Sequence, residues 1–501
     1  MDLTVLHLAI PEITRDLEPS SAQLLWIIDI YGFIVAGSLI TMGTLGDRIG
    51  RRRLLMIGAA AFGIASVVAA LSTSSEMLIA TRALLGLAGA TLAPSTLSLI
   101  RNMFVDQKQR TKAIAVWITS FSVGAAIGPL VGGLVLEFFW WGAAFLVAVP
   151  VMALLLVLGP RLLPEYRDPS PGRLDLASAA LSLVAVLAVT FGLKQIAQSG
   201  LGSLPIVSIV VGLAVGVVFV RRQQRLTDPF IDLRLFRTPA FTGALVTYGL
   251  GVVIVFGGFL FLPQYLQLVL GLSPLQAGLW TLPWALAFIV GSQLTPRLVR
   301  RMRPASVMGG GMALAAVGFA TFTQLHETSG FGVFLFGSAL FSLGLAPVFT
   351  LAIDLIVGVA PPERAGAASA IAETAAEFGG AIGIASFGSL GIAIYRRGID
   401  AGVPAEVPSG LVGVARDTLG GAVEVAAQLP DRVAAALLDT ARDAFIQGIH
   451  VAAAISSVAV IALAIFAVVV LRAVRLGSEP EVEAEVIAGG SQPLEPAPVE
   501  C

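Results

Sequence analysis

Long apolar segments, separated by short polar or charged stretches, follow one another along almost the entire chain. Thirteen of these segments reach the length of about 20 residues that a helix needs to cross a bilayer core of roughly 30 Å. Their approximate limits are 23–43, 54–72, 77–100, 112–136, 143–163, 175–194, 203–220, 240–263, 275–296, 305–323, 330–357, 366–395 and 440–471. Residues 1–10 are apolar but too short to cross, and we interpret them as the outer half of a further, incomplete span. The pattern predicts an all-α polytopic membrane protein with fourteen transmembrane helices.

Positive charges are distributed unevenly between the two sides that this pattern defines. Of the 31 Lys and Arg residues, 23 fall in alternate loops and the C-terminal segment, beginning with the densely basic turn at 43–53. The short loops of the other side hold two, Arg15 and Lys194, and five more lie in the long loop 396–442. Because short basic loops stay in the cytoplasm, we expect the basic turn and both termini to be cytoplasmic, in a multi-pass protein of the cell membrane.

The composition agrees with a membrane protein. Hydrophobic residues make up 56% of the chain and charged residues 13%, whereas about 25% of residues are charged in soluble domains. The net charge of -1 gives no reason to expect a nucleic-acid partner. The single cysteine, Cys501, excludes an internal disulfide. Residues 476–501 are acidic and proline-rich, which indicates a disordered cytoplasmic tail.

Sequence signatures of ATP hydrolysis and metal chemistry are missing. None of the three lysines stands in a Gly-x-x-x-x-Gly-Lys-Ser/Thr phosphate loop, and no His-Glu-x-x-His occurs. The histidines are scattered over different segments, at His7, His326 and His450, so we expect no metal site. We therefore expect a transporter rather than an enzyme, with no cofactor and with an ion gradient as its source of energy.

The basic turn carries a family signature. Its matching positions are Gly43, Leu45, Asp47, Arg48, Gly50, Arg51 and Arg52. They resemble the motif between the second and third helices of the major facilitator superfamily, and the resemblance covers nearly the whole chain. Glycines there permit a tight turn and close helix approach, and Asp47 suits a helix N-terminus. We expect the arginines to anchor at the lipid surface and to pair with acids.

Two further motifs point to exporters of this superfamily. Arg82, with Gly86, Gly89 and Ala90, resembles the fourth-helix motif whose buried arginine is implicated in proton coupling, although Leu85 replaces the usual glutamine. The fifth-helix antiporter motif is matched by Gly124, Gly128, Pro129, Gly132 and Gly133, with Ala115 in place of an upstream glycine. Small residues let helices approach and the proline bends one, although plain helix packing is an alternative explanation of this run.

Fourteen spans, residues 1–11, the stretch 26–31 and the stretch 362–379 resemble QacA-type drug:proton antiporters. That resemblance implies a major facilitator fold of two six-helix bundles, 1–165 and 238–475, with two additional helices in 166–237 between them. A degraded copy of the basic hairpin at 291–301 agrees with two related halves. We interpret residues 400–436 as an extracellular helical hairpin, and a disordered loop is the alternative.

Acidic residues inside the spans are the candidates for the chemistry, because charges in a bilayer are expensive and usually functional. They are Asp2, Asp29, Glu373 and Glu377. At about 1.5 Å per residue, Asp2 and Glu377 fall near the midplane and Asp29 in the outer half. Asp354 lies closer to the inner end, where we expect it to reach water. The resemblance implies roles in proton and cation coupling for the four candidates other than Asp354. Asp2 and Asp29 match acidic positions of the first and second helices, and Glu373 and Glu377 match acids of the thirteenth.

The acids, together with Arg82, suggest antiport in which a proton and a cationic substrate compete for the same carboxylates. Glu373 and Glu377 are four residues apart and share one helical face, so in a partly dry cavity only one of them ionises readily. A lipophilic cation then displaces the proton from the cytoplasmic side, and an entering proton displaces the cation. The family's acid in the tenth helix has no counterpart in 282–290, so we expect monovalent cations. Pairing of Asp29 or Glu373 for packing alone is the alternative.

Aromatic residues of the spans can stack on quaternary ammonium compounds and dyes, each contact contributing about 0.5–2 kcal/mol. The candidates are Trp26, Tyr31, Trp117, Phe121 and Trp284. We therefore expect proton-coupled export of lipophilic cations by a monomer in the lipid bilayer. Export of a non-cationic metabolite or a self-made antibiotic, and a sensor without transport, are the alternatives, because fold alone does not choose among them.

Overall fold

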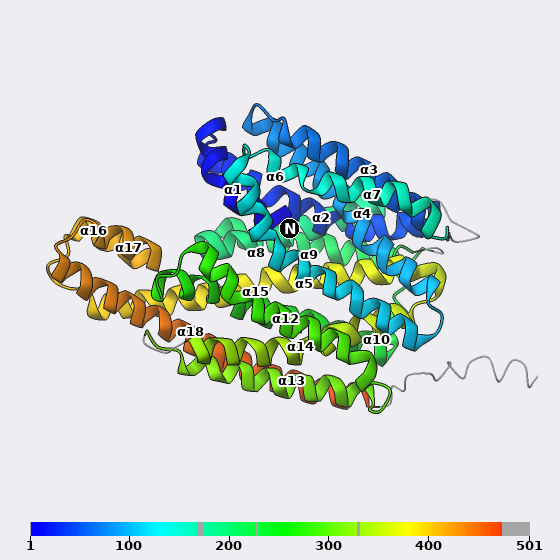
Figure 1. Cartoon of the computed structure of the whole chain (residues 1–501). Coiled ribbons are helices and arrows are strands. Elements are labelled where there is room, and N and C mark those ends of the chain that lie inside the picture. The colour runs from blue at the N-terminus through cyan, green and yellow to red at the C-terminus, as the bar shows by residue number, and fades with distance from the viewer. Residues whose placement is uncertain (1, 168–174, 227–228, 328–330, 473–501) are drawn as a thin grey trace, which may run out of the picture.

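The computed structural model describes residues 2–167, 175–226, 229–327 and 331–472, and it is built from helices (Figure 1). The first part of the chain forms α1 (Asp2–Leu17), α2 (Ser21–Ile49), α3 (Arg51–Ala70), α4 (Ser75–Met103), α5 (Gln107–Phe138), α6 (Ala143–Leu146) and α7 (Ala148–Leu162). Two helices follow, α8 (Leu176–Ser199) and α9 (Ser203–Gln223).

The rest of the chain forms a second set of helices. They are α10 (Pro239–Phe259), α11 (Leu262–Gln264), α12 (Pro274–Leu298), α13 (Pro304–Thr321), α14 (Phe331–Val359), α15 (Ala365–Gly402), α16 (Ser409–Asp417), α17 (Leu419–Ala426) and α18 (Asp431–Leu471). Short helical turns, η1 (Leu235–Arg237), η2 (Tyr265–Val269), η3 (Phe322–Gln324) and η4 (Pro362–Arg364), connect some of them.

Twelve helices are long and apolar enough to cross a membrane within the part of the chain that the structure describes. They coincide with twelve of the thirteen expected complete spans, and the chain is a multi-pass membrane protein. The predicted count of fourteen is not confirmed, because the spans expected at 1–10 and 112–136 are not among the twelve, although α1 and α5 run over them. The predicted tail, 476–501, lies outside the described residues.

Local sequence explains where several helices begin. Ser20 and Ser273 each accept a hydrogen bond from the backbone N–H three residues later, and the glutamine there bonds back, which forms a capping box at the start of α2 and of α12. Gly50 alone separates α2 from α3, with φ of 113°, a left-handed conformation that favours glycine. The basic hairpin is therefore a one-residue turn between two helices.

The helices form two groups around a central seam (Figure 1). Buried apolar residues of α1–α4, with Trp141 and Phe145, form one cluster, and a larger one is built mainly from α10–α18. The larger cluster also takes in Leu97 of α4 and Ile114 of α5, near the basic hairpin. The two groups therefore share a core at that end.

The pair α8 and α9 lies beside this seam. The two helices pack on one another, and α8 also contacts α2 of the first group and α15 of the second. At the end of the molecule away from the basic hairpin, α15 and α18 project beyond the bundle (Figure 1). There α16 packs against α15 and α17 packs against α18. The Tyr395 hydroxyl of α15 fixes this arrangement, since it donates to the carbonyl oxygens of Ala415 at 2.8 Å and Thr418 at 3.1 Å.

Candidate functional site

A central cavity of about 640 Å³ lies between the two groups of helices. Side chains of α2, α5, α8, α10, α12, α14 and α15 line it. Its charged lining residues, among those that the structure describes, are Asp29, Lys194, Glu373 and Glu377. Three of the four predicted acids therefore meet in one cavity, although they come from opposite halves of the chain. The side chain of Asp2, the fourth, is outside the described residues.

The two glutamates of α15 differ in exposure. Glu377 is exposed toward the cavity, whereas Glu373 is half-buried one turn closer to the basic hairpin. The Glu373 Oε1 atom is buried and has no hydrogen-bond partner among the described residues. A buried carboxylate without a donor is strongly disfavoured, so this oxygen is suited to carry a proton or to receive a cation that enters the cavity.

Asp29 contacts a basic residue that we did not predict as part of the site. The Lys194 Nζ atom lies 2.6 Å from the Asp29 Oδ1 atom. It also lies 4.5 Å from the centre of the Phe33 ring, at cation–π distance. The sequence pattern assigns Lys194 to the outer loops, but the residue belongs to α8 and lines the cavity, which corrects that assignment.

Three of the five predicted aromatic residues line the cavity, namely Trp117, Phe121 and Trp284. The rings of Trp117 and Phe121 meet edge to face at 4.6 Å. Trp26 and Tyr31 are not part of this lining; Trp26 is exposed, and the Tyr31 ring lies 5.2 Å from a guanidinium group within the first half. The predicted aromatic residues that line the cavity therefore come from α5 and α12, from opposite halves, and further aromatic side chains of α10, α12 and α14 line it too.

The guanidinium beside Tyr31 is that of Arg82, which is completely buried in α4. Its Nε atom donates to the Ile27 carbonyl oxygen at 2.8 Å, and the group lies 6.0 Å from the Phe145 ring. Ile27 precedes Asp29 by two residues on α2. Arg82 therefore holds the segment of α2 that carries Asp29, without lining the cavity itself.

Asp47 of the basic hairpin joins the two halves. Its carboxylate accepts hydrogen bonds from the backbone N–H groups of Gly366 and Ala367, both at 3.2 Å, in the first turn of α15. An anion is favoured at a helix N-terminus. The sequence suggested such a position for Asp47, and the helix concerned is α15, which belongs to the other half of the chain. Gly43 also lies against the Gly366 carbonyl, where a Cβ atom would collide with the backbone.

The arginines of the hairpin differ from our expectation of lipid-surface anchors. Arg51 is completely buried, and Arg48 is half-buried. Their partners are Asp47 and Ser98 for Arg51, Glu165 at 3.7 Å for Arg52, and the Phe230 ring at 5.8 Å for Arg48. The pairing of Arg51 and Arg52 with acids agrees with the prediction. Arg51 does not lie at the lipid surface as expected, because its partners Asp47 and Ser98 are inside the protein.

A second contact at this end involves Asp354, which we expected to reach water. It is completely buried in α14. Its carboxylate accepts from the Arg110 Nε atom at 2.8 Å and from the Thr111 hydroxyl at 2.5 Å, both on α5. Arg101 of α4 donates to the Gly358 carbonyl oxygen at 3.4 Å. The expectation was wrong because the cation comes from a distant segment and shields the carboxylate from solvent.

The glycine motif of α5 makes less use of close packing than we expected. No atom of the described residues lies within 4 Å of a Cβ atom placed on Gly124 or Gly133. Gly128 and Gly132 are buried, and the side chain of Pro129 is outside the described residues. Close helix approach therefore does not explain Gly124 and Gly133 in this conformation.

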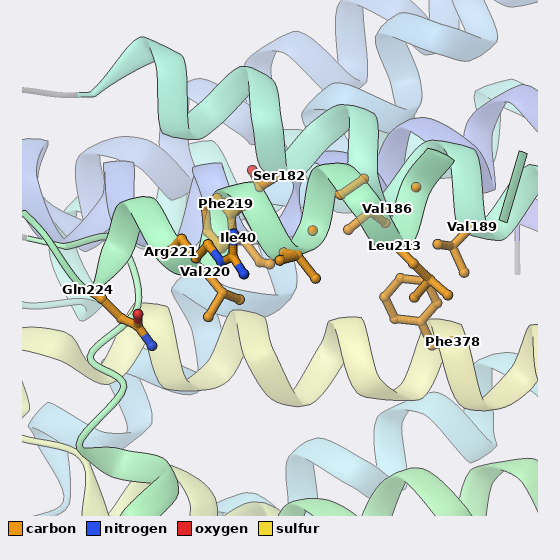
Figure 2. Close-up of a pocket in the computed structure, with 14 residues that line it drawn as sticks. Ile40, Ser182, Val186, Val189, Leu213, Phe219, Val220, Arg221, Gln224 and Phe378 are labelled. Carbon is orange, nitrogen blue, oxygen red and sulfur yellow. The ribbon is translucent and has the colours of Figure 1, made fainter. Parts of the chain in front are cut away.

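A second cavity, of about 580 Å³, lies between the α8–α9 pair and α15. Figure 2 shows Phe378 of α15 beside Leu213 and Val189 at one end, and Arg221 and Gln224 at the other. Because Phe378 directly follows Glu377, a single turn of α15 contributes to both cavities.

Comparison with known proteins agrees with this architecture. The model of the Major Facilitator Superfamily matches residues 1–384. The chain belongs to the major facilitator superfamily. This superfamily consists of membrane transporters, and the paired helix groups with a central cavity are its fold.

Curated members of the superfamily cover most of the chain. The multidrug efflux pump LfrA of Mycolicibacterium smegmatis is 44% identical over 93% of this chain and 92% of its own. The methyl viologen resistance protein SmvA of Salmonella typhimurium is 37% identical over 89% and 90%. The tetracenomycin C resistance and export protein of Streptomyces glaucescens is 32% identical over 93% and 88%. These relatives are drug efflux and resistance proteins.

Solved structures of major facilitator transporters have the same fold. The human organic anion transporter MFSD10 aligns with a TM-score of 0.55 at 16% identity, covering 89% of each chain. A double tryptophan variant of XylE aligns with a TM-score of 0.57 at 13% identity, covering 94% of this chain and 92% of its own. At these identities, the likeness concerns the fold alone.

The sequence did not predict two cations, Lys194 in the cavity and Arg110 beside Asp354, or aromatic lining residues such as Tyr248 and Phe349. Lys194 is a single cation in an otherwise apolar span, a signal for a functional residue that we read as a loop charge. Arg110 gave no such signal, because it stands in a basic loop among other charges. Its burial against Asp354 depends on how the halves pack.

Proposed function

We propose that this protein exports lipophilic cationic drugs, antiseptics and dyes from the cytoplasm in exchange for protons. The observation that carries the proposal is the central cavity, whose lining combines Glu373 and Glu377 with aromatic side chains that include Trp117, Phe121 and Trp284. Carboxylates and aromatic faces are the two groups that attract an apolar cation. The names of the relatives support drug efflux.

The mechanism follows from the positions of the two glutamates. Glu373 holds a proton on its unpartnered, buried oxygen, whereas Glu377 faces the solvent of the cavity. A cation that enters from the cytoplasm approaches the pair and favours their ionised form, so the proton leaves. A proton that arrives from outside neutralises the pair and releases the cation there. The same carboxylates thus bind each substrate in turn.

Alternating access requires that the cavity open to one side at a time. With the basic hairpin in the cytoplasm, as the distribution of charges indicates, the Asp47 contact with α15 and the Arg110–Asp354 pair close the inner side. The structure then corresponds to an outward-facing state. Breaking these contacts and forming new ones at the outer side converts it to the inward-facing state.

The experiment is ethidium efflux from energised cells that express the protein, with and without a protonophore. We expect efflux that the protonophore abolishes. Asp29→Asn and Glu373→Gln should each lose drug-dependent proton release while the protein stays in the membrane. The matched control is Glu424→Gln, since Glu424 is an exposed acid of α17, far along the chain from the cavity. Normal efflux by both cavity variants would refute the carboxylate mechanism.

Export of a non-cationic antibiotic is the second candidate, favoured by the likeness to the tetracenomycin C export protein. Under that function the wild type exports tetracenomycin C but not ethidium, in the same cells and at the same expression. The two functions therefore give opposite results in parallel efflux assays.

A further inference from the structure

Lys194 occupies a place that resembles a binding site for a cationic ligand. Its ammonium group lies 2.6 Å from the Asp29 carboxylate and 4.5 Å from the centre of the Phe33 ring. A carboxylate and an aromatic face are the same two groups that a lipophilic cation needs. The ammonium also packs beside α2, since a Cβ atom placed on Gly32 would lie 3.8 Å from it, at ordinary van der Waals distance. Lys194 is thus a cation tethered to the protein.

The lysine also changes the charge of the cavity. The described residues that line the cavity include three acids, Asp29, Glu373 and Glu377, and one base, Lys194. Lys194 compensates Asp29, and the glutamates share a proton, so one negative charge remains for a ligand. Without Lys194 the same cavity has two. A cavity with one uncompensated negative charge favours a monovalent cation, because a second positive charge would have no partner.

The pair α8 and α9 supplies this lysine from outside the two groups of helices. Lys194 is near the end of α8 and lines the same cavity as Glu373 and Glu377 of α15. It is only one-third exposed, so an ionised ammonium there requires a compensating charge. A purely structural pair would satisfy this requirement too, but it would not be expected to line the cavity beside the two glutamates.

We infer that Lys194 determines the charge selectivity of the cavity: it neutralises Asp29 and restricts binding to monovalent cations. The inference rests on the proposed function, because it assigns a specificity determinant to the same site. A dication such as methyl viologen requires Asp29 as a second carboxylate, and Lys194 competes with it there. Removal of the ammonium should therefore turn the cavity into a site for divalent cations.

The test measures binding by calorimetry on the purified full-length protein, with tetraphenylphosphonium as the monovalent probe and methyl viologen as the divalent one. Lys194→Met keeps the length of the side chain and removes its charge. We expect the ratio of methyl viologen affinity to tetraphenylphosphonium affinity to rise on the order of tenfold, the effect of one additional charged contact of about 1.4 kcal/mol. Lys194→Arg and the exposed-site control Lys112→Met should keep the wild-type ratio.

An unchanged ratio in Lys194→Met would overturn the inference, and so would an equal rise in Lys194→Arg, because the charge would then not be the cause. If Lys194→Met does not fold, Asp29→Asn and the double variant Asp29→Asn/Lys194→Met are compared. The single variant leaves the lysine uncompensated and should bind tetraphenylphosphonium more weakly than the double variant. Equal affinities would count against the inference. Failure of the proposed function is separate: it is the absence of protonophore-sensitive ethidium efflux by the wild type.

Discussion

Asp354 offers the sharpest test of how the two halves are held together. The change is Asp354→Asn, which preserves the size of the side chain and removes its charge. The wild-type carboxylate is completely buried and accepts from Arg110 at 2.8 Å and from Thr111 at 2.5 Å. Without it, the buried Arg110 guanidinium loses its counter-charge and Arg101 remains nearby as a second cation.

The expected magnitude follows from the burial of the pair. Removing one partner of a buried ion pair costs about 3–5 kcal/mol, because the other charge stays buried without compensation. Arg110 is 7% exposed and close to the end of the bundle, so we take the lower value of about 3 kcal/mol. The contact exists only while the halves meet at the inner side. The population ratio of inner-closed to inner-open protein should therefore fall on the order of 100-fold.

Accessibility of a single cysteine measures this ratio. Ser122 is a small residue of the cavity lining, and Ser122→Cys is introduced together with Cys501→Ser, which removes the natural cysteine. A membrane-impermeant maleimide should label the reference protein rapidly in whole cells and slowly in inside-out vesicles. Asp354→Asn should reverse this order.

The matched control is Asp417→Asn. Asp417 forms an exposed pair with Arg396 at 2.8 Å, and exposed pairs contribute only about 0–1 kcal/mol. It should leave both labelling rates as in the reference protein. Unchanged rates in Asp354→Asn, at a normal amount of membrane protein, would show that the buried pair does not hold the inner side closed.

Three further predictions concern other contacts. The side-chain hydrogen bond from Arg222 lowers the pKa of Asp175 to about 2, so this contact stabilises the protein above the ordinary carboxyl pKa of about 4 and is lost as the pH falls toward 2. Asp175→Asn should lower the apparent melting temperature in detergent at pH 7, and its difference from wild type should vanish near pH 2. Gly43→Val should abolish ethidium efflux without loss of insertion, because its side chain would meet the backbone of Gly366; wild-type efflux would show that the halves need no close approach there. Tyr395→Phe removes the one hydroxyl proton that the two carbonyl oxygens share, a loss of about 1 kcal/mol, and should speed proteolysis within α16 and α17, whereas equal cleavage rates would exclude this role.

Much of the fold could be predicted from the apolar periodicity. The expected span 23–43 lies within α2, and the span 203–220 lies within α9, because a run of apolar residues bounded by charges leaves few choices for a helix in a membrane. The helices extend beyond the apolar runs where polar residues continue them into water. This is why α18 begins at Asp431 although the apolar run begins near 440.

The site was predictable in its acids and less so in its cations. Glu373 and Glu377 stand in an apolar span, where a carboxylate is conspicuous, and the structure places both in the cavity. Lys194 is conspicuous as a cation in an apolar span, but its pairing, like that of Arg110, depends on packing, since their partners lie 165 and 244 residues away in the sequence. No local pattern encodes such a pairing.

The separation of Arg110 from Asp354 has a consequence for the synthesis of the protein. At about 5–20 residues per second, the ribosome needs on the order of tens of seconds to extend the chain from Arg110 to Asp354, 244 positions later. During that time the first group of helices is already in the membrane, with Arg110 lacking the carboxylate that neutralises it in the finished protein. A chain that stops before α14 would keep this unpaired cation permanently, and membrane quality-control proteases would have a chemical mark that distinguishes half-made molecules from complete ones.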